Sequence, residues 1–123
     1  MLHLLLIKQF DNLEYILESF HDDIFDYVHI HSYLDGFIFN LIDVIISLKT
    51  NDKSRAKTIF SHLDIDKITD SSYCDYYLIF YYLVGYNLHQ NTTHQKQCSD
   101  QFKKLAKQSG FTLFNRNYLK NYF

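Results

Sequence analysis

Proline and tryptophan are absent from this chain of 123 residues, and glycine occurs only three times. Proline breaks helices because it lacks a backbone N–H and clashes with the preceding turn, so its absence suits long uninterrupted helices. Three glycines are too few to build a phosphate-cradling loop, and neither a P-loop nor a dinucleotide-binding motif occurs. The sequence therefore favours helices and excludes the usual nucleotide-binding signatures.

Cysteine is also scarce, and the sequence offers no metal-ligand pattern. Cys74 and Cys98 are the only two cysteines, and they form no CxxC motif or zinc spacing. His29 and His31 make an HxH pair, but on a helix they point about 200° apart. A single disulfide is one alternative for the cysteines; we interpret them as buried small residues in a reducing cytoplasm. No metal and no cofactor is predicted.

One pair of residues suggests nucleophilic chemistry. His94 and Cys98 lie one helical turn apart, which permits contact between their side chains. A Cys–His pair is nucleophilic when a third group orients the histidine. Cys98 also lies on an apolar stripe, however, and we therefore favour a buried, inert thiol and predict that the chain is not an enzyme.

Charge is distributed unevenly, although the net charge is only −2. Residues 1–50 carry two lysines against eight acidic residues, a net −6, whereas residues 96–123 carry six basic residues against Asp100 alone, a net +5. Such a distribution is compatible with head-to-tail association, but surface charges usually only solvate the outer helices, and we favour that interpretation. Arginine, the main reader of bases, occurs only at Arg55 and Arg116, so no direct nucleic-acid binding is predicted.

The N-terminal run from Leu2 to Ile7 is apolar but short. It lacks the basic flank and the small-residue cleavage site of a signal peptide, and it is too short to span a membrane. We therefore expect a cytoplasmic protein that uses this run as an interface, which favours a homodimer.

Apolar residues recur with helical spacing in three places about forty residues apart. Offsets of i, i+3, i+4 and i+7 share one face of a helix, so each stripe predicts an amphipathic helix. The second and third stripes follow longer apolar segments, and a recurring long-helix, short-helix unit is typical of an α-solenoid. The three stripes are Leu13, Ile16, Leu17 and Phe20; Ala56, Ile59, Phe60 and Leu63; and Cys98, Phe102 and Leu105.

We accordingly expect an all-α fold of about six or seven helices, arranged as TPR-like helical hairpin repeats in a single domain over residues 1–123. Expected N-caps are Asp11, either Asp52 or Ser54, and Thr93, and Gly110 is expected to end a helix. Residues 76–84 have high β-propensity, but their apolar run is too long for one strand. The expected helices cover residues 2–9, 13–20, 25–49, 53–63, 73–89 and 93–109, with a terminal helix after Gly110.

Tyrosine is abundant and provides the strongest indication of a binding site. Six of the eleven tyrosines crowd residues 73–86, and six buried hydroxyl groups would be hard to satisfy, so some should line a groove or an interface. The asparagine side chain can bind a peptide backbone, because its amide both donates and accepts hydrogen bonds. The alternative is that these residues only complete helix surfaces. The predicted ligand contacts are Tyr33, Phe37, Asn40, Tyr77 and Tyr81.

Two segments of the sequence resemble a known family. The segments SRAKTIFSHLDIDKITDSSYCDYYLIFYYLVGYNLHQ and QCSDQFKKLAKQSGF resemble the tetratricopeptide-like C-terminal regulatory domain of Rgg/GadR/MutR-type transcription regulators, over residues 25–123. The resemblance implies repeats that bind a short signalling peptide on a concave face and mediate dimerisation. The helix-turn-helix of that family is not expected in this chain, so the resemblance implies a sensor-like module without its own DNA-binding domain.

The leading prediction is therefore a non-enzymatic peptide- or protein-binding module of regulatory type. The alternative is a small helical inhibitor or a bacteriocin-immunity-type protein that occludes a target or acts at a membrane surface. In that alternative the basic, aromatic C-terminal part contacts the target or the membrane surface. Its aromatic residues are Phe111, Phe114, Tyr118, Tyr122 and Phe123.

Overall fold

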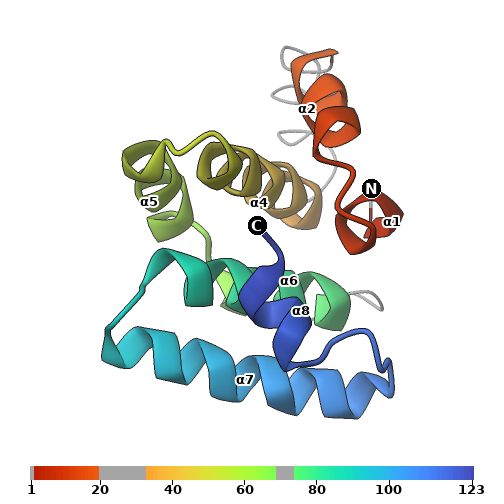
Figure 1. Ribbon diagram of the computed structural model, residues 1–123. Helices are drawn as coiled ribbons and strands as arrows, with labels where there is room; N and C mark the ends of the chain where they lie inside the picture. The colour runs from red at the N-terminus through yellow and green to blue at the C-terminus, as the bar shows by residue number, and fades with distance from the viewer. Residues whose placement is uncertain (1, 20–32, 69–73) are drawn as a thin grey trace. The chain divides into compact units, whose positions relative to one another are not determined.

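The computed structural model describes residues 2–19, 33–68 and 74–123, and these form seven α-helices, one 3₁₀ helix and no strand (Figure 1). The all-α prediction is confirmed for these residues. The chain divides into two compact units, Met1–Ser71 and Ser72–Phe123, which are described separately below. The single domain expected over residues 1–123 stays a prediction.

The first unit is built around its longest helix. It contains α1 (Leu2–Leu6), α2 (Phe10–Ser19), α4 (Tyr33–Lys49), α5 (Lys53–Ser61) and the 3₁₀ helix η1 (Ile65–Ile68). Helix α4 contacts α2, α5 and η1, and α1 contacts α2. The central position of α4 follows from its apolar sequence, whose side chains Leu41, Val44 and Ile45 have no exposed surface. The part of the expected helix over residues 25–32 lies outside the described residues.

The second unit contains α6 (Cys74–Leu88), α7 (Thr93–Ser109) and the short α8 (Arg116–Asn121). Helix α6 packs along α7 and also contacts α8. Residues 76–84 are helical, as their length predicts despite their β-propensity. The core of this unit takes side chains from all three helices: Ile79, Phe80, Leu83, Val84, Phe102, Leu119 and Tyr122.

Three tight turns between helices share one local design. The backbone of Lys8, Asn51 and Asn91 is left-handed, with φ values of 60°, 64° and 63°. Asparagine tolerates this conformation better than most residues. In each case the next residue leads directly into a helix, so the same turn recurs at intervals of 43 residues (51 − 8) and 40 residues (91 − 51).

The caps after these turns confirm one prediction and correct two. Asp52 caps α5, since the Arg55 N–H donates to its Oδ1 at 3.2 Å. Thr92, and not the expected Thr93, caps α7 by accepting from a backbone N–H. Asp11 is not a cap either, because α2 begins one residue before it. It lies in the first turn, where a carboxylate favours the positive end of the helix dipole.

The helix expected over residues 93–109 is confirmed, but it is a long helix and not the third short one. Helix α7 has 17 residues, as many as α4 and more than the nine of α5. The capping threonine starts α7 well before its apolar stripe, and Gly110 ends it in the left-handed region with φ 69°, as predicted. The alternation of long and short helices therefore does not hold in the second unit.

Candidate functional site

The five residues predicted to contact a ligand lie on two helices. Tyr33, Phe37 and Asn40 belong to α4, where Phe37 is 1% exposed and Asn40 is exposed. The side chain of Tyr33 lies outside the described residues. Tyr77 and Tyr81 are partly exposed and lie one turn apart on α6. The structure thus brings the two tyrosines together, whereas Phe37 is a core residue and its predicted role gains no support from its position.

The tyrosines of α6 occupy intermediate environments. The five described ones, at positions 76, 77, 81, 82 and 86, are all partly exposed, in keeping with their amphipathic rings. The rings of Tyr81 and Tyr82 meet edge to face at a centroid distance of 5.2 Å. Asn87 does not present its amide to a ligand, because Nδ2 donates to the backbone oxygens of Leu83 at 2.8 Å and Leu119 at 3.3 Å.

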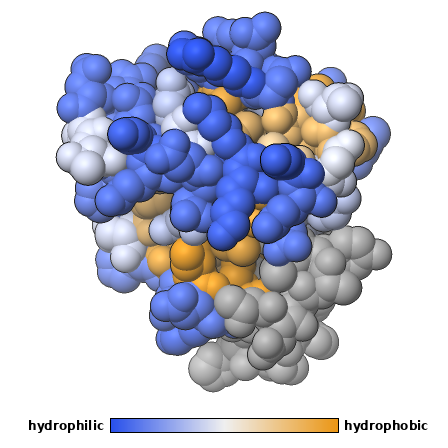
Figure 2. Space-filling model, turned by 90° about the horizontal axis from the view of Figure 1, so that it is seen from below, coloured by the Kyte–Doolittle hydropathy of each residue, from blue (hydrophilic) through white to orange (hydrophobic). Residues whose placement is uncertain are grey.

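An open groove of ≈ 390 Å³ lies within the second unit. It is formed by the last turns of α7, the loop that follows and the start of α8. Figure 2, which views the molecule from the side of α7, shows orange hydrophobic patches between blue hydrophilic side chains. The lining residues are Phe102, Lys103, Ala106, Lys107, Gly110, Phe111, Thr112, Phe114, Asn115, Arg116 and Leu119.

Local hydrogen bonds fix the loop that closes this groove. Gly110 turns the chain through the left-handed region, and the Phe111 N–H donates to Ser109 Oγ at 3.1 Å. Asn115 then begins α8: its Oδ1 accepts from the Tyr118 N–H at 3.0 Å, and its Nδ2 donates to the Thr112 oxygen at 3.3 Å. One side chain therefore both caps the helix and holds the loop beside the groove.

Aromatic contacts support the floor of the groove. Phe114 is 5% exposed, and its ring meets those of Phe80, Phe102 and Tyr118 edge to face at centroid distances of 6.0, 6.2 and 5.7 Å. It therefore joins α6, α7 and α8 through one side chain. Phe111 packs on Phe114 at 5.5 Å but remains 46% exposed, so it forms a wall of the groove and not part of the core.

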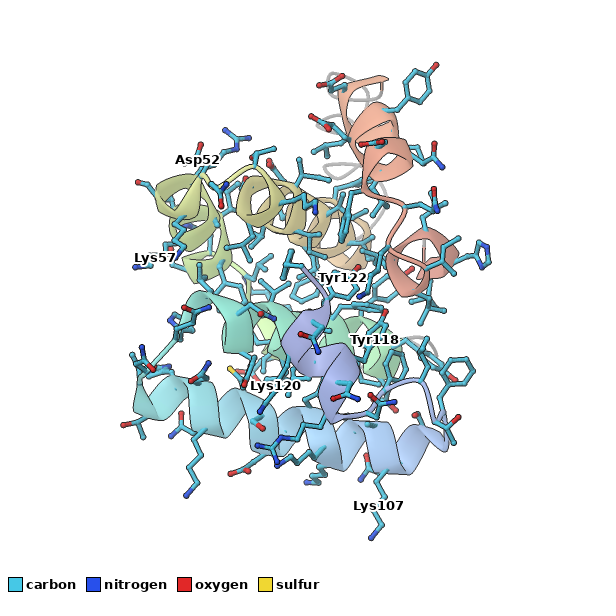
Figure 3. All side chains as sticks on the ribbon, viewed as in Figure 1. Asp52, Lys57, Lys107, Tyr118, Lys120 and Tyr122 are labelled. Carbon is cyan, nitrogen blue, oxygen red and sulfur yellow. The ribbon has the colours of Figure 1, made fainter. Side chains whose placement is uncertain are left out.

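The rim of the groove is positively charged. Lys103 and Lys107 lie one turn apart on α7, and Arg116 begins α8; all three are exposed. Figure 3 shows Lys107 extending outward from α7. No acidic side chain occurs from residue 101 to 123, and none of the three cations forms an ion pair with a described residue. The groove thus combines an apolar floor with uncompensated positive charge.

Sequence reasoning did not single out this groove as the leading site, although its parts were visible. The basic stretch and Phe111 were both noted, the latter as part of the alternative C-terminal working region. The end of the helix at Gly110 is predicted from the sequence, but the path of the loop that folds Phe111 back beside the lysines of α7 is not.

The pair His94 and Cys98 lacks the features of an activated nucleophile. Burial raises the pKa of the Cys98 thiol, whereas a reactive cysteine needs a lowered pKa. The ring of His94 lies 5.3 Å from that of His89 and is exposed to solvent. Among the described residues no group of three or more histidine, cysteine, aspartate or glutamate side chains is arranged to hold a metal ion.

The first unit has a hollow of its own, of ≈ 450 Å³, between the turn after α1, α2 and the end of α4. Its lining mixes Lys8 and Lys49 with Asp11 and Glu14, so neither sign of charge dominates. Lys49 lies over the ring of Phe10, with Nζ 5.3 Å from the centroid. This hollow selects no class of ligand as clearly as the groove does.

Comparison with protein families, curated proteins and solved structures gives no match for this chain. The resemblance to Rgg-type regulatory domains therefore stays a prediction. In the part of the chain that the structure describes, no helix is both long enough and apolar enough to cross a membrane.

Proposed function

We propose that this chain is a non-enzymatic binding module that takes an acidic peptide or protein segment in the groove at the end of α7. The observation that supports this proposal is an apolar floor whose lining includes three exposed cations and no acidic residue. Pockets of this size, near the small end of the usual range of about 300–1,000 Å³, suit one or two side chains.

The two parts of the groove recognise two parts of such a ligand. An apolar or aromatic side chain packs against Phe111 and the floor, which removes apolar surface from water. Flanking carboxylates face Lys103, Lys107 and Arg116, whose charge attracts them and sets their orientation. The ligand is therefore a segment in which an apolar residue lies between acidic ones.

A helical-repeat architecture of TPR-like type forms part of the same proposal. The left-handed turns at Lys8, Asn51 and Asn91 support it, because they recur at intervals of about forty residues. Such modules present helix pairs for binding and seldom perform catalysis. We accordingly propose a cytoplasmic sensor or regulatory component that acts through its bound partner and has no cofactor.

The test measures binding of a fluorescein-labelled peptide of alternating glutamate and leucine to the purified chain by fluorescence anisotropy. The expected result is saturable binding that weakens as ionic strength rises, because exposed charges are screened. The variant K103E/K107E is expected to bind about tenfold more weakly, since two reversed contacts together cost about 1–2 kcal/mol.

The chain offers a matched control for this variant. Lys53 and Lys57 on α5 are exposed and have the same spacing of four residues, so K53E/K57E changes the net charge equally on a helix of the other unit that does not line the groove. It should bind the peptide as the wild type does. Equal affinity of K103E/K107E and the wild type would contradict the proposal. A loss confined to Y77A/Y81A would instead move the site to the tyrosines of α6.

A second candidate function is action at an anionic membrane surface, as an inhibitor or immunity-type protein. Phe111 and Leu113 favour it, because they are 46% and 39% exposed beside the basic rim. Sedimentation with vesicles of phosphatidylserine tests this candidate, and F111S/L113S should abolish co-sedimentation. Substitution is preferable to deletion of the C-terminal part, since Leu119 and Tyr122 are buried. Binding to vesicles but not to the peptide would favour this second function.

A further inference from the structure

The outer face of α2 carries the features that the groove selects. Asp11, Tyr15 and Glu18 recur at i, i+4 and i+7, so they share one side of the helix. Leu13, with no exposed surface, marks the opposite side, where α2 contacts α1 and α4. Tyr15 is 70% exposed, the largest fraction among the exposed large hydrophobic side chains described. An aromatic side chain thus stands in water between two carboxylates.

Charge on this face is complementary to charge around the groove. Helix α2 itself carries Asp11, Glu14 and Glu18 and no basic residue, although Lys8 and Lys49 lie beside its first turn in the hollow that Asp11 and Glu14 line. The groove carries three cations and no acidic residue in its lining. The same asymmetry extends over the chain, since residues 1–50 have a net charge of −6 and residues 96–123 of +5. Opposite charge at the two ends of one chain favours contact between copies.

We propose that α2 of a second copy of this chain occupies the groove. Tyr15 packs against Phe111 and the apolar floor, and Asp11 and Glu18 face the cations. This inference rests on the proposed function and names its ligand.

The proposed contact joins two different surfaces, so it is heterologous and not the isologous contact of a two-fold dimer. Each copy keeps a free α2 or a free groove after its first contact. Assembly should therefore continue beyond the dimer as concentration rises, or stop only where the rotation closes a ring.

Sedimentation equilibrium of the full chain over a range of concentrations tests this inference. At about 0.1 M salt the average mass should rise well above the 14.8 kDa of one chain. At about 1 M salt, where the Debye length falls from about 10 Å to about 3 Å, the mass should return toward that of the monomer. The variant Y15A should weaken assembly at about 0.1 M salt, because it removes the aromatic anchor.

Two charge-reversal variants separate the surfaces. D11K/E18K keeps an intact groove and K103E/K107E keeps an intact α2, and each alone should remain a monomer. Mixed in equal amounts, they should assemble again to a mass above the 14.8 kDa of one chain, because the intact α2 of one variant meets the intact groove of the other and the two reversed surfaces are also complementary in charge. The control K53E/K57E should assemble as the wild type does. These substitutions lie on exposed side chains, so the folded state should be retained.

Three results would overturn the inference. They are a wild-type chain that stays monomeric at every concentration, assembly that K103E/K107E leaves unchanged, and a mixture of the two variants that forms no complex. The glutamate–leucine peptide separates this inference from the proposed function. A monomeric chain that binds the peptide overturns only the second copy as ligand, whereas a chain that neither assembles nor binds the peptide overturns both.

Discussion

The two units of the chain use different chemistry for their cores. Among the largest fully buried side chains, the first unit contributes Phe37 with five leucines and isoleucines, whereas half of those in the second unit are aromatic: Phe80, Phe102 and Tyr122. Aliphatic packing depends mainly on volume, while aromatic rings also prefer edge-to-face arrangements. The second unit should therefore be less tolerant of substitutions that keep hydrophobicity but lose the ring.

Polar contacts differ between the units as well. In the first unit an exposed ion pair links α4 to α5, with Arg55 and Asp43 as partners. In the second unit side-chain amides donate to backbone oxygens: Asn87 reaches Leu119, and Gln95 Nε2 reaches the Tyr86 oxygen at 3.2 Å. Hydrogen bonds to partly buried carbonyls are less screened by water than exposed charges are. We therefore expect the loss of a polar contact to lower the free energy of unfolding more in the second unit than in the first.

Phe114→Ala should produce the largest loss of stability. This side chain joins all three helices of the second unit, and removal of a buried phenylalanine costs about 3–5 kcal/mol. Urea denaturation followed by near-ultraviolet circular dichroism, which reports on packed aromatic rings, provides the measurement. Phe111→Ala is the control, because a side chain that is 46% exposed should change stability by only about 0.5 kcal/mol. Equal losses for the two variants would refute the assignment of Phe114 as the centre of this core.

Alkaline pH should weaken the second unit through its buried tyrosines. Burial raises the pKa of Tyr118 and Tyr122 above the ordinary value, and the proximity of Tyr118 raises that of Tyr122 further. At pH values between the ordinary tyrosine pKa of about 10 and the raised pKa values of the folded state, the folded state binds more protons than the unfolded state. Stability is therefore complete below about pH 10 and is lost as pH rises from there toward the raised folded pKa values.

The rate of this loss is at most about 1.4 kcal/mol per pH unit for each tyrosine. The variant Y118F/Y122F keeps both rings and removes both titrating hydroxyl groups. Its free energy of unfolding, measured in urea between pH 9 and pH 11, should fall less steeply with pH than that of the wild type. Parallel curves for the two proteins would show that these hydroxyl groups do not cause the loss.

The sequence predicts most helices of this chain, but only some of their caps and ends. Helical spacing and the lack of proline predicted the helices, and local chemistry predicted Asp52 as a cap and Gly110 as a helix end. Asp11 and Thr93 lie inside the first turns of α2 and α7 and are not their caps, because these helices begin at Phe10 and Thr93, two residues after the left-handed residues Lys8 and Asn91. Propensity alone does not reveal a left-handed turn.

The groove illustrates what sequence reasoning could not supply. Its lysines and Phe111 were recognised as a basic, aromatic region, but their convergence depends on a chain reversal held by Asn115. Phe37 and Asn40 lie three residues apart on α4, so their side chains are close on the helix surface. The periodicity does not show which of the two faces the core. Tertiary packing decides that question, and here it buries Phe37.

Loss of a helix cap should cost more in the second unit than in the first. Asn115→Ala removes both the cap of α8 and the hydrogen bond that holds the groove loop, whereas Asp52→Ala removes one cap on an exposed turn. Caps contribute about 0.5–2 kcal/mol, so we expect the alanine at 115 to lie near the upper limit and the alanine at 52 near the lower. Thermal denaturation compares them, and the reverse order would contradict the view that one side chain supports the whole loop.

The smallest expected effect concerns the ion pair of the first unit. Arg55 donates to both carboxylate oxygens of Asp43, from Nε at 3.2 Å and from Nη2 at 2.8 Å, and this contact raises the pKa of the guanidinium. The Arg55 side chain is 54% exposed, so water and salt screen the attraction.

A double-mutant cycle of R55A and D43A should therefore give a coupling free energy of about 0.2–1 kcal/mol, which shrinks as salt is added. Such a value would mean that α5 is held on α4 mainly by the apolar contacts of its buried residues Ala56 and Phe60. A coupling above about 2 kcal/mol would instead place the ion pair among the principal contacts of this hairpin. The contrast with the amide-linked second unit would then disappear, because both hairpins would depend on strong polar contacts.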